Sequence, residues 1–206
     1  MLHYETVEPH TLELLNSLMK ISIFENLRLV GGTSLSLQIG HRKSIDLDLF
    51  GKADLTEIDI SKAISPLGEV KLLKKTPNIY IYLINGIKVD FVNYPYPWLE
   101  NQILFDGIRL ATKKDIAAMK LSAIAGRGTK KDFVDLFYLL KDYTLADLLS
   151  SFKQKYHDGS EFLVLKSLTY FEDANDGEIE MFDNYGWKKI KQFIIKSHQS
   201  YLDSLL

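Results

Sequence analysis

The stretch Ile45-Asp46-Leu47-Asp48-Leu49-Phe50 places an acidic residue at every second position among apolar ones. Successive side chains of a β-strand point to opposite faces of the sheet, so a strand here carries both carboxylates on one face. Two neighbouring carboxylates are not buried dry, because burial of unpaired charge is costly. The sequence therefore predicts a sheet with an apolar face packed into a core and an acidic patch on its other face.

Turn residues and hydrophobic spacing divide the chain into a mixed first half and a helical second half. The patterns predict strands at 27–30, 45–50, 69–75, 79–84, 87–92, 103–105 and 108–110, and helices at 9–25, 35–39, 56–65, 113–126, 130–142, 145–156, 160–171 and 186–204. Asn85-Gly86 and Asp106-Gly107 are typical of tight hairpins. We therefore predict an α+β fold, with an α/β core at 1–110 and a helical domain at 111–206.

The predicted helix ends rest on local capping signals. Thr33 and Ser34 precede the predicted helix at 35–39 and are predicted to cap it. Thr112 and Asp115 have the spacing of a capping box, with Asp in the place of Glu. Thr129 is a predicted N-cap of the helix that begins at residue 130.

Composition excludes several classes of protein. The 206 residues include no Cys, so disulfides and Cys-ligated zinc are excluded. The chain is 46% hydrophobic and 25% charged, as is typical of a globular protein. It contains no apolar run of membrane-spanning length, and MLHYETVEPHTLELL has no apolar core of the signal-peptide kind. We expect a cytoplasmic protein that does not enter a membrane.

Three features of the first half predict one kind of chemistry. A strand runs into Gly31-Gly32-Thr33-Ser34, Asp46 and Asp48 follow on the next predicted strand, and Asp90 lies on the strand at 87–92. Carboxylate oxygens are the ligands that Mg²⁺ prefers, and three carboxylates on neighbouring strands would suit a two-metal site for phosphoryl displacement. Glycines before a helix let a phosphate approach the backbone N–H groups. The pattern indicates a nucleoside triphosphate bound with magnesium.

Two stretches resemble a known family. The run from Leu29-Val30-Gly31-Gly32-Thr33-Ser34 to Arg42-Lys43-Ser44-Ile45-Asp46-Leu47-Asp48 is similar to the first motif of the AbiEii-type nucleotidyltransferase toxins, which belong to the polymerase-β-like superfamily. The run from Met119-Lys120 to Arg127 and on through Lys131-Asp132-Phe133-Val134-Asp135 resembles the downstream helical motif of that family. The resemblance implies a polymerase-β-like core with a mixed sheet, followed by a C-terminal helical bundle.

The resemblance also implies roles for individual residues. Asp46 and Asp48 would hold magnesium, and Lys120 would lie near the nucleotide phosphates. Asp132 would orient the substrate or that lysine. The positions implied for nucleotide binding are Gly31, Gly32, Thr33, Ser34, Arg42 and Lys120. Asp90 is assigned as the third metal ligand, on the base side of the site, from its place on the following strand.

Each of these residues also has a simpler interpretation. Asp46 and Asp48 would lie on the solvated face of an edge strand, and Asp90 would be a surface charge next to Lys88. The stem of Lys120 would lie along a core-facing helix without a ligand. Asp132 and Asp135 would compensate a helix dipole, the interpretation we favour for Asp135.

The predicted function is transfer of a nucleoside monophosphate from an NTP to RNA, as implied for the toxin of a toxin–antitoxin pair whose relatives act on tRNA ends. A basic stretch with a single acid suits such an acceptor; it contains Lys113, Lys114, Lys120, Arg127, Lys130 and Lys131. One alternative keeps the metal site but transfers to a small hydroxylated molecule, such as an aminoglycoside. Another binds nucleotide without turnover and acts through a partner protein. A cognate antitoxin is the implied protein partner.

Overall fold

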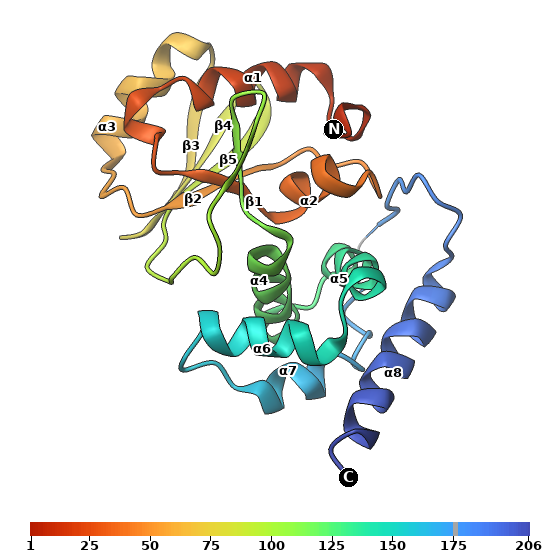
Figure 1. Cartoon of the computed structure of the whole chain (residues 1–206). Helices are drawn as coiled ribbons and strands as arrows, with labels where there is room; N and C mark the ends of the chain where they lie inside the picture. The colour runs from red at the N-terminus through yellow and green to blue at the C-terminus, as the bar shows by residue number, and fades with distance from the viewer. Residues whose placement is uncertain (175–176) are drawn as a thin grey trace. The chain divides into compact units, whose positions relative to one another are not determined.

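The computed structural model describes residues 1–174 and 177–206. The chain forms two compact units (Figure 1). The sheet unit consists of Met1–Tyr96 and Asn101–Ala111, and the helical unit consists of Pro97–Glu100 and Thr112–Leu206. Within the described ranges no helix combines the length and apolar character that crossing a membrane requires.

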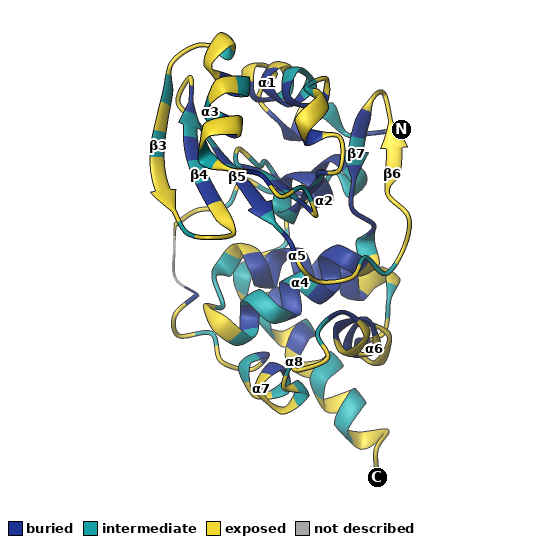
Figure 2. Ribbon diagram, turned by 90° about the vertical axis from the view of Figure 1, so that its left-hand side faces the viewer, coloured by how far each residue is buried: buried dark blue, intermediate teal, exposed yellow. Residues whose placement is uncertain are grey.

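The sheet unit is built on one seven-stranded mixed sheet, with the strand order β3-β4-β5-β2-β1-β7-β6. The strands are β1 (Arg28–Val30), β2 (Leu47–Gly51), β3 (Val70–Lys75), β4 (Ile79–Ile84), β5 (Ile87–Asn93), β6 (Ile103–Phe105) and β7 (Ile108–Leu110). β2 pairs with β5 and β1 with β7 in parallel, and the other neighbours are antiparallel. The edge strands β3 and β6 are largely exposed, whereas the central strands are mostly buried (Figure 2).

Both hairpins form where the turn residues predict them. Asn85 and Gly86 have φ values of 49° and 82°, and Asp106 and Gly107 have φ values of 49° and 79°. Two successive positive φ values match the right-handed twist of the flanking strands, and Asn, Asp and Gly adopt them with little strain.

The apolar core lies on one face of the sheet. Three helices complete this unit, namely α1 (Pro9–Met19), α2 (Gly31–Ile39) and α3 (Glu57–Ile64). Leu47, Leu49, Val89 and Phe91 pack in one cluster with buried side chains of α1 and α3. Because side chains alternate along a strand, Asp48 and Asp90 project from the opposite face. The predicted division into an apolar face and an acidic face is the arrangement observed.

The helical unit contains α4 (Lys113–Gly126), α5 (Lys130–Asp142), α6 (Leu145–Lys155), α7 (Glu161–Ser167) and α8 (Trp187–Asp203). α4 packs against α5, α6 and α7, and α8 packs against α5 and α6. The mixed sheet and the helices that follow it confirm the predicted α+β fold class. The helices predicted at 9–25 and 160–171 are shorter than expected, ending at Met19 and Ser167.

A buried polar cluster fixes Pro97–Glu100 to the helical unit. Lys155 and Asp115 are both fully buried, and Lys155 Nζ lies 2.7 Å from Asp115 Oδ1. The same ammonium donates to the carbonyl of Pro97 at 2.7 Å, and the N–H of Leu99 donates to Asp115 Oδ1 at 3.0 Å. Thr112 accepts from the Asp115 N–H as predicted. The Asp115 carboxylate anchors this segment, whereas we expected it to complete a capping box.

Candidate active site

The acidic face of the sheet is formed by neighbouring positions of β2 and β5. Asp48 is directly paired with Asp90 in the parallel register, and Leu47 is paired with Val89. Asp46 lies immediately before β2 and two residues before Asp48. Lys88 precedes Asp90 by two residues on β5, so it belongs to the same face. The three predicted carboxylates are therefore brought to one face, together with a lysine.

Lys88 is the charge partner of Asp90. Its Nζ lies 2.6 Å from Asp90 Oδ1, and the two side chains are 38% and 16% exposed. Asp90 Oδ1 is shielded from solvent and makes no well-aligned hydrogen bond within the described part of the chain. Burial alone would lower the pKa of Lys88, but the close contact with the Asp90 carboxylate, with the charges of Asp48 and Asp46, raises it. The ammonium is therefore cationic at neutral pH and is attracted by all three carboxylates.

Gly31 is required by its close approach to Asp48. Its φ is +67°, a conformation that side chains disfavour, and a Cβ at this position would lie 2.2 Å from Asp48 Oδ2. The turn after β1 therefore packs directly against the carboxylate. This contact ties the glycine turn to the acidic face.

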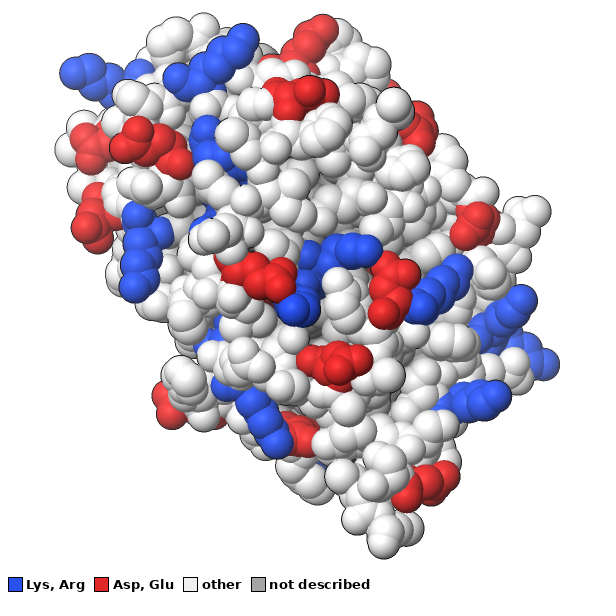
Figure 3. All heavy atoms as spheres, in the orientation of Figure 1, with Lys and Arg blue, Asp and Glu red and all other residues white. Residues whose placement is uncertain are grey.

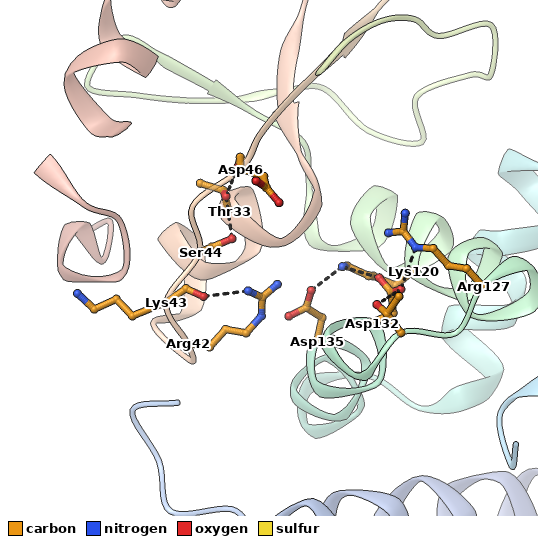
Figure 4. Close-up of polar contacts among 10 residues, drawn as sticks. Thr33, Arg42, Lys43, Ser44, Asp46, Lys120, Arg127, Asp132 and Asp135 are labelled. Atoms are coloured by element: carbon orange, nitrogen blue, oxygen red, sulfur yellow. Dashed lines mark hydrogen bonds and ion pairs between the residues drawn. The ribbon is translucent and has the colours of Figure 1, made fainter. Parts of the chain in front are cut away.

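Gly32 is required by a different side chain. A Cβ there would lie 2.0 Å from an Nη atom of Arg42. Arg42 is only 3% exposed, and its Nη1 donates to the carbonyl of Lys43 at 2.9 Å (Figure 4). The guanidinium is thus held against the glycine turn by its own backbone segment.

The hydroxyl groups of Thr33 and Ser34 point into the protein. Thr33 Oγ1 donates to the carbonyl of Asp46 and contacts Ser44 Oγ at 2.8 Å (Figure 4). Ser34 Oγ accepts from the side-chain amide of Gln38 at 3.2 Å. Thr33 and Ser34 are both buried. The predicted N-caps are wrong, because α2 begins at Gly31 and neither hydroxyl caps it. Thr33 instead holds the chain segment that leads Asp46 into β2.

The helical unit holds the second group of predicted residues. Lys120 on α4 lies 3.0 Å from Asp132 Oδ1 and 2.6 Å from Asp135 Oδ2, both on α5 (Figure 4). The exposed fractions of the three side chains are 9%, 1% and 0%. The structure thus brings Lys120 and Asp132 into contact, which fits one of the two roles expected for Asp132.

Asp132 receives further donors from the start of α5. Thr129 Oγ1 donates to Asp132 Oδ2 at 2.7 Å, and Arg127 Nε lies 3.3 Å from the same oxygen. Burial alone would raise the pKa of Asp132, but Lys120, the Thr129 hydroxyl and Arg127 together lower it below its ordinary value. The Thr129 side chain makes no capping bond to the helix backbone, so the predicted cap instead serves the carboxylate.

Asp135 does not take the role that its position in the sequence favoured. We favoured compensation of the helix dipole, but the side chain is fully buried against the ammonium of Lys120. The available signal was its spacing of three residues from Asp132, which places both on one side of a helix. Lys120, which contacts both Asp132 and Asp135, lies on α4, so spacing along α5 alone does not identify it.

The basic stretch between residues 113 and 131 is largely neutralised. Lys113 pairs with Asp142 at 2.7 Å, and Lys114 pairs with Glu100 at 2.8 Å. Lys120 and Arg127 meet the buried carboxylates of α5, and Lys130 donates to the carbonyl of Gly177. The charge density of this stretch is thus mostly balanced by distant acids, which weakens it as an argument for an RNA surface.

The carboxylates of the sheet unit fit a hard cation by their chemistry. Asp46, Asp48 and Asp90 supply oxygen donors on one face, and Asp90 Oδ1 is a buried acceptor without a well-aligned donor. Among the residues that the structure describes, however, no three acidic or histidine side chains converge closely enough to enclose a metal ion. The donor set is present, and the ammonium of Lys88 lies among its charges.

The chain matches known proteins over nearly its whole length. An uncharacterized protein of Aquifex aeolicus is 37% identical over 198 residues, which cover 93% of this chain and 96% of that protein. Two Helicobacter pylori structures share the fold over 96% of each chain. A candidate nucleotidyltransferase is 20% identical with a TM-score of 0.59, and JHP933 is 17% identical with a TM-score of 0.52.

A family match extends from residue 13 to residue 200, and the family is described as nucleotidyl transferase AbiEii toxin, type IV TA system. This match covers both stretches on which the resemblance was based, Gly31 to Asp48 and Lys120 to Asp135. The chain therefore belongs to the AbiEii family of nucleotidyltransferase toxins.

Proposed function

We propose that this nucleotidyltransferase depends on magnesium and transfers a nucleoside monophosphate from an NTP to an RNA acceptor, with release of pyrophosphate. The observation that carries the proposal is the pairing of Asp48 with Asp90 on adjacent parallel strands, with Asp46 beside them and the Gly31 turn against Asp48. In the cell we expect the enzyme to act as a toxin with a cognate antitoxin, as its family description implies.

Asp46, Asp48 and Asp90 would hold the magnesium. When bound, magnesium would supply positive charge for the triphosphate and for an in-line displacement at its α-phosphate. Lys88 would have to give up its contact with Asp90 for this to happen.

The glycine turn would receive the triphosphate through backbone N–H groups. Gly31 and Gly32 open α2, and the first N–H groups of a helix have no partner within the helix. In the structure, the hydroxyls of Thr33 and Ser34 are engaged inside the protein. We propose that Thr33 contributes to catalysis indirectly, by holding the backbone of Asp46 in place. We also propose that Arg42 adds positive charge next to Gly31 and Gly32, where the triphosphate would bind.

The assignments in the helical unit follow from the family motif. Lys120 is proposed to bind the nucleotide phosphates, with Asp132 as a positioning residue that holds the lysine. The contact of 3.0 Å between these side chains supports the second role. A lysine with two buried carboxylates keeps its charge and a defined place.

An RNA acceptor is supported by the surface of α8. The first ten residues of this helix include Lys188, Lys189, Lys191 and Lys196 and no acid. At about 100° per residue, Lys188, Lys189 and Lys196 lie on the side of the helix away from the buried Ile190 and Ile194. Lys191 lies on the flank between the two sides and is half-buried. Figure 3 shows Lys and Arg side chains gathered over the first half of α8, at the right-hand edge. Positive charges near a helix N-terminus interact unfavourably with the helix dipole, so these lysines do not stabilise the helix through it.

Aromatic rings lie among these cations. Lys189 Nζ is 4.7 Å from the ring of Tyr185, and Lys191 Nζ is 5.8 Å from the ring of Trp187. Both rings are partly exposed. Lysines alternating with accessible aromatic rings suit a single-stranded RNA, whose phosphates meet the cations and whose bases stack on rings.

The acceptor is tested by label transfer. The pure protein is incubated with each α-labelled NTP and Mg²⁺, with total tRNA in one series and a panel of hydroxylated small molecules in another. We expect label on tRNA and equimolar pyrophosphate. Label found only on a small molecule would show that the acceptor is not RNA. Binding of NTP without release of pyrophosphate would contradict the proposed enzymatic activity.

The α8 surface predicts a specific salt dependence. Replacing Lys188 and Lys196 together by Gln is expected to weaken tRNA binding and to reduce the slope of log K against log salt concentration by about 1.4, because each lost phosphate contact on a single strand contributes roughly 0.7. Fluorescence anisotropy with labelled tRNA at several salt concentrations measures this slope. The control is Lys20→Gln with Lys62→Gln, the same charge change at exposed positions of the α1 and α3 side of the sheet unit, away from the acidic face. If the slope of log K against log salt concentration were equal in the two double variants, α8 would be excluded as the tRNA-binding surface.

A further inference from the structure

We propose that Lys88 is a built-in counter-cation of the acidic face, which a divalent metal ion must displace, so that the site takes up metal together with nucleotide and only weakly without it. The inference rests on the proposed metal site and adds a residue that regulates how this site is loaded.

The register places the lysine within the carboxylate group. β2 and β5 run in parallel with Leu47 opposite Val89 and Asp48 opposite Asp90. Continuing this register by one residue brings Lys88 beside Asp46. The lysine therefore belongs at the corner between Asp46 and Asp90, on the face that carries no apolar core.

The contact with Asp90 occupies the atom that a metal would need. Lys88 Nζ is 2.6 Å from Oδ1, a buried oxygen without a well-aligned donor among the described residues. A magnesium ion bound to this oxygen would lie about 2.1 Å from it, and so within about 5 Å of the ammonium. Two cations at that separation repel each other while competing for one acceptor. Metal binding at Asp90 thus requires the lysine to move.

The lysine has the freedom to move, and a nucleotide would favour the movement. Its side chain is 38% exposed, whereas the Asp90 side chain is 16% exposed. The ammonium can leave for solvent or for another anion, whereas the carboxylate stays in place. A triphosphate that binds with the metal brings several negative charges, and Lys88 could pair with them in place of Asp90. Metal without nucleotide offers no such compensation.

The test measures metal binding in the absence of nucleotide. Mn²⁺ serves as the probe, with the free ion followed by electron paramagnetic resonance, for the wild type, Lys88→Met, Lys88→Gln and Lys88→Arg. We expect Lys88→Met and Lys88→Gln to bind Mn²⁺ about tenfold more tightly than the wild type, since a partly buried ion pair no longer opposes binding. Lys88→Arg keeps the cation and should stay near the wild type. Adding a non-hydrolysable NTP should narrow the difference between the wild type and Lys88→Met.

Two controls separate this inference from the proposed function. Lys62→Met removes one charge from an exposed position of α3, on the core side of the sheet, and should leave Mn²⁺ affinity unchanged. Asp48→Asn should abolish Mn²⁺ binding in every background. Equal affinity of the wild type and both neutral Lys88 variants, with Asp48 still required, would overturn the role of Lys88 and leave the metal site standing. Mn²⁺ binding that does not depend on Asp48, with or without NTP, would overturn both. Thermal melting with and without Mn²⁺ shows that each variant is folded and supplies a second measure of affinity.

Discussion

Replacement of Asp48 by Asn is expected to reduce the rate of nucleotidyl transfer by about a thousandfold, roughly 4 kcal/mol of transition-state stabilisation, because a carboxylate at the centre of the proposed metal site is lost. The shape of the side chain is kept, so its packing against Gly31 is preserved. Thermal stability should change little, since one of three clustered negative charges is removed. Release of pyrophosphate from NTP and tRNA measures the rate.

The matched control for Asp48 is Glu69→Gln, which removes one negative charge from an exposed position of the same unit. This variant should retain the wild-type rate. Growth inhibition in cells provides an independent measurement, and Asp48→Ala should abolish it together with transfer. Persistent toxicity of a variant that no longer transfers nucleotide would show that the protein acts through binding alone.

Replacement of Lys120 by Met is expected to have the largest effect on folding. The substitution leaves Asp132 and Asp135 side by side with exposed fractions of 1% and 0%. Removing one partner of a buried ion pair typically costs about 3–5 kcal/mol in the free energy of unfolding, because the two buried carboxylates lose the cation that they share. Urea denaturation at neutral pH measures this loss.

The effect of Lys120→Met should depend on pH in a defined direction. In the wild type the pKa of Asp132 is lowered in the folded state, so its contribution is present above its unfolded pKa near 3.8 and is lost as the pH falls through the folded value. In the variant, burial and mutual repulsion favour protonation of one carboxylate, so acid relieves the cost. The stability difference should therefore shrink as the pH falls. Lys114→Met, which breaks an exposed pair on the same helix, should leave stability nearly unchanged. An equal loss in both variants would contradict the proposed burial effect.

Local signals predicted most of the fold. The hairpins at Asn85-Gly86 and Asp106-Gly107 require a backbone conformation that these residue types supply, so their positions follow from a few neighbouring residues. The start of α5 was predicted at residue 130, where the helix begins. The start of α2 was not, because Gly31 and Gly32 look like a turn in sequence, and the two side chains packed against them, Asp48 and Arg42, come from later segments of the chain.

Contacts between distant elements limited the prediction of the site. The resemblance identified Asp46, Asp48, Lys120 and Asp132 and offered Lys120 as one partner of Asp132, but it gave no partner for Asp46 or Asp48. Lys88 was interpreted as a neighbour of a surface charge, because its link to Asp46 and Asp48 appears only when β2 and β5 are aligned. Helical spacing likewise could not show that the carboxylate of Asp135 meets a lysine of α4.

The anchoring of Pro97–Glu100 to Asp115 and Lys155 means that the helical half is not a continuous piece of the polypeptide. A fragment that starts at Thr112 would lack the Leu99 N–H and the Pro97 carbonyl, and it would keep two buried charges with part of their hydrogen bonding missing. Dissecting the enzyme at one boundary near residue 111 therefore removes a structural component from the portion downstream. A version of the helical unit that keeps all its hydrogen bonds must include Pro97–Glu100, for instance joined to the unit by circular permutation.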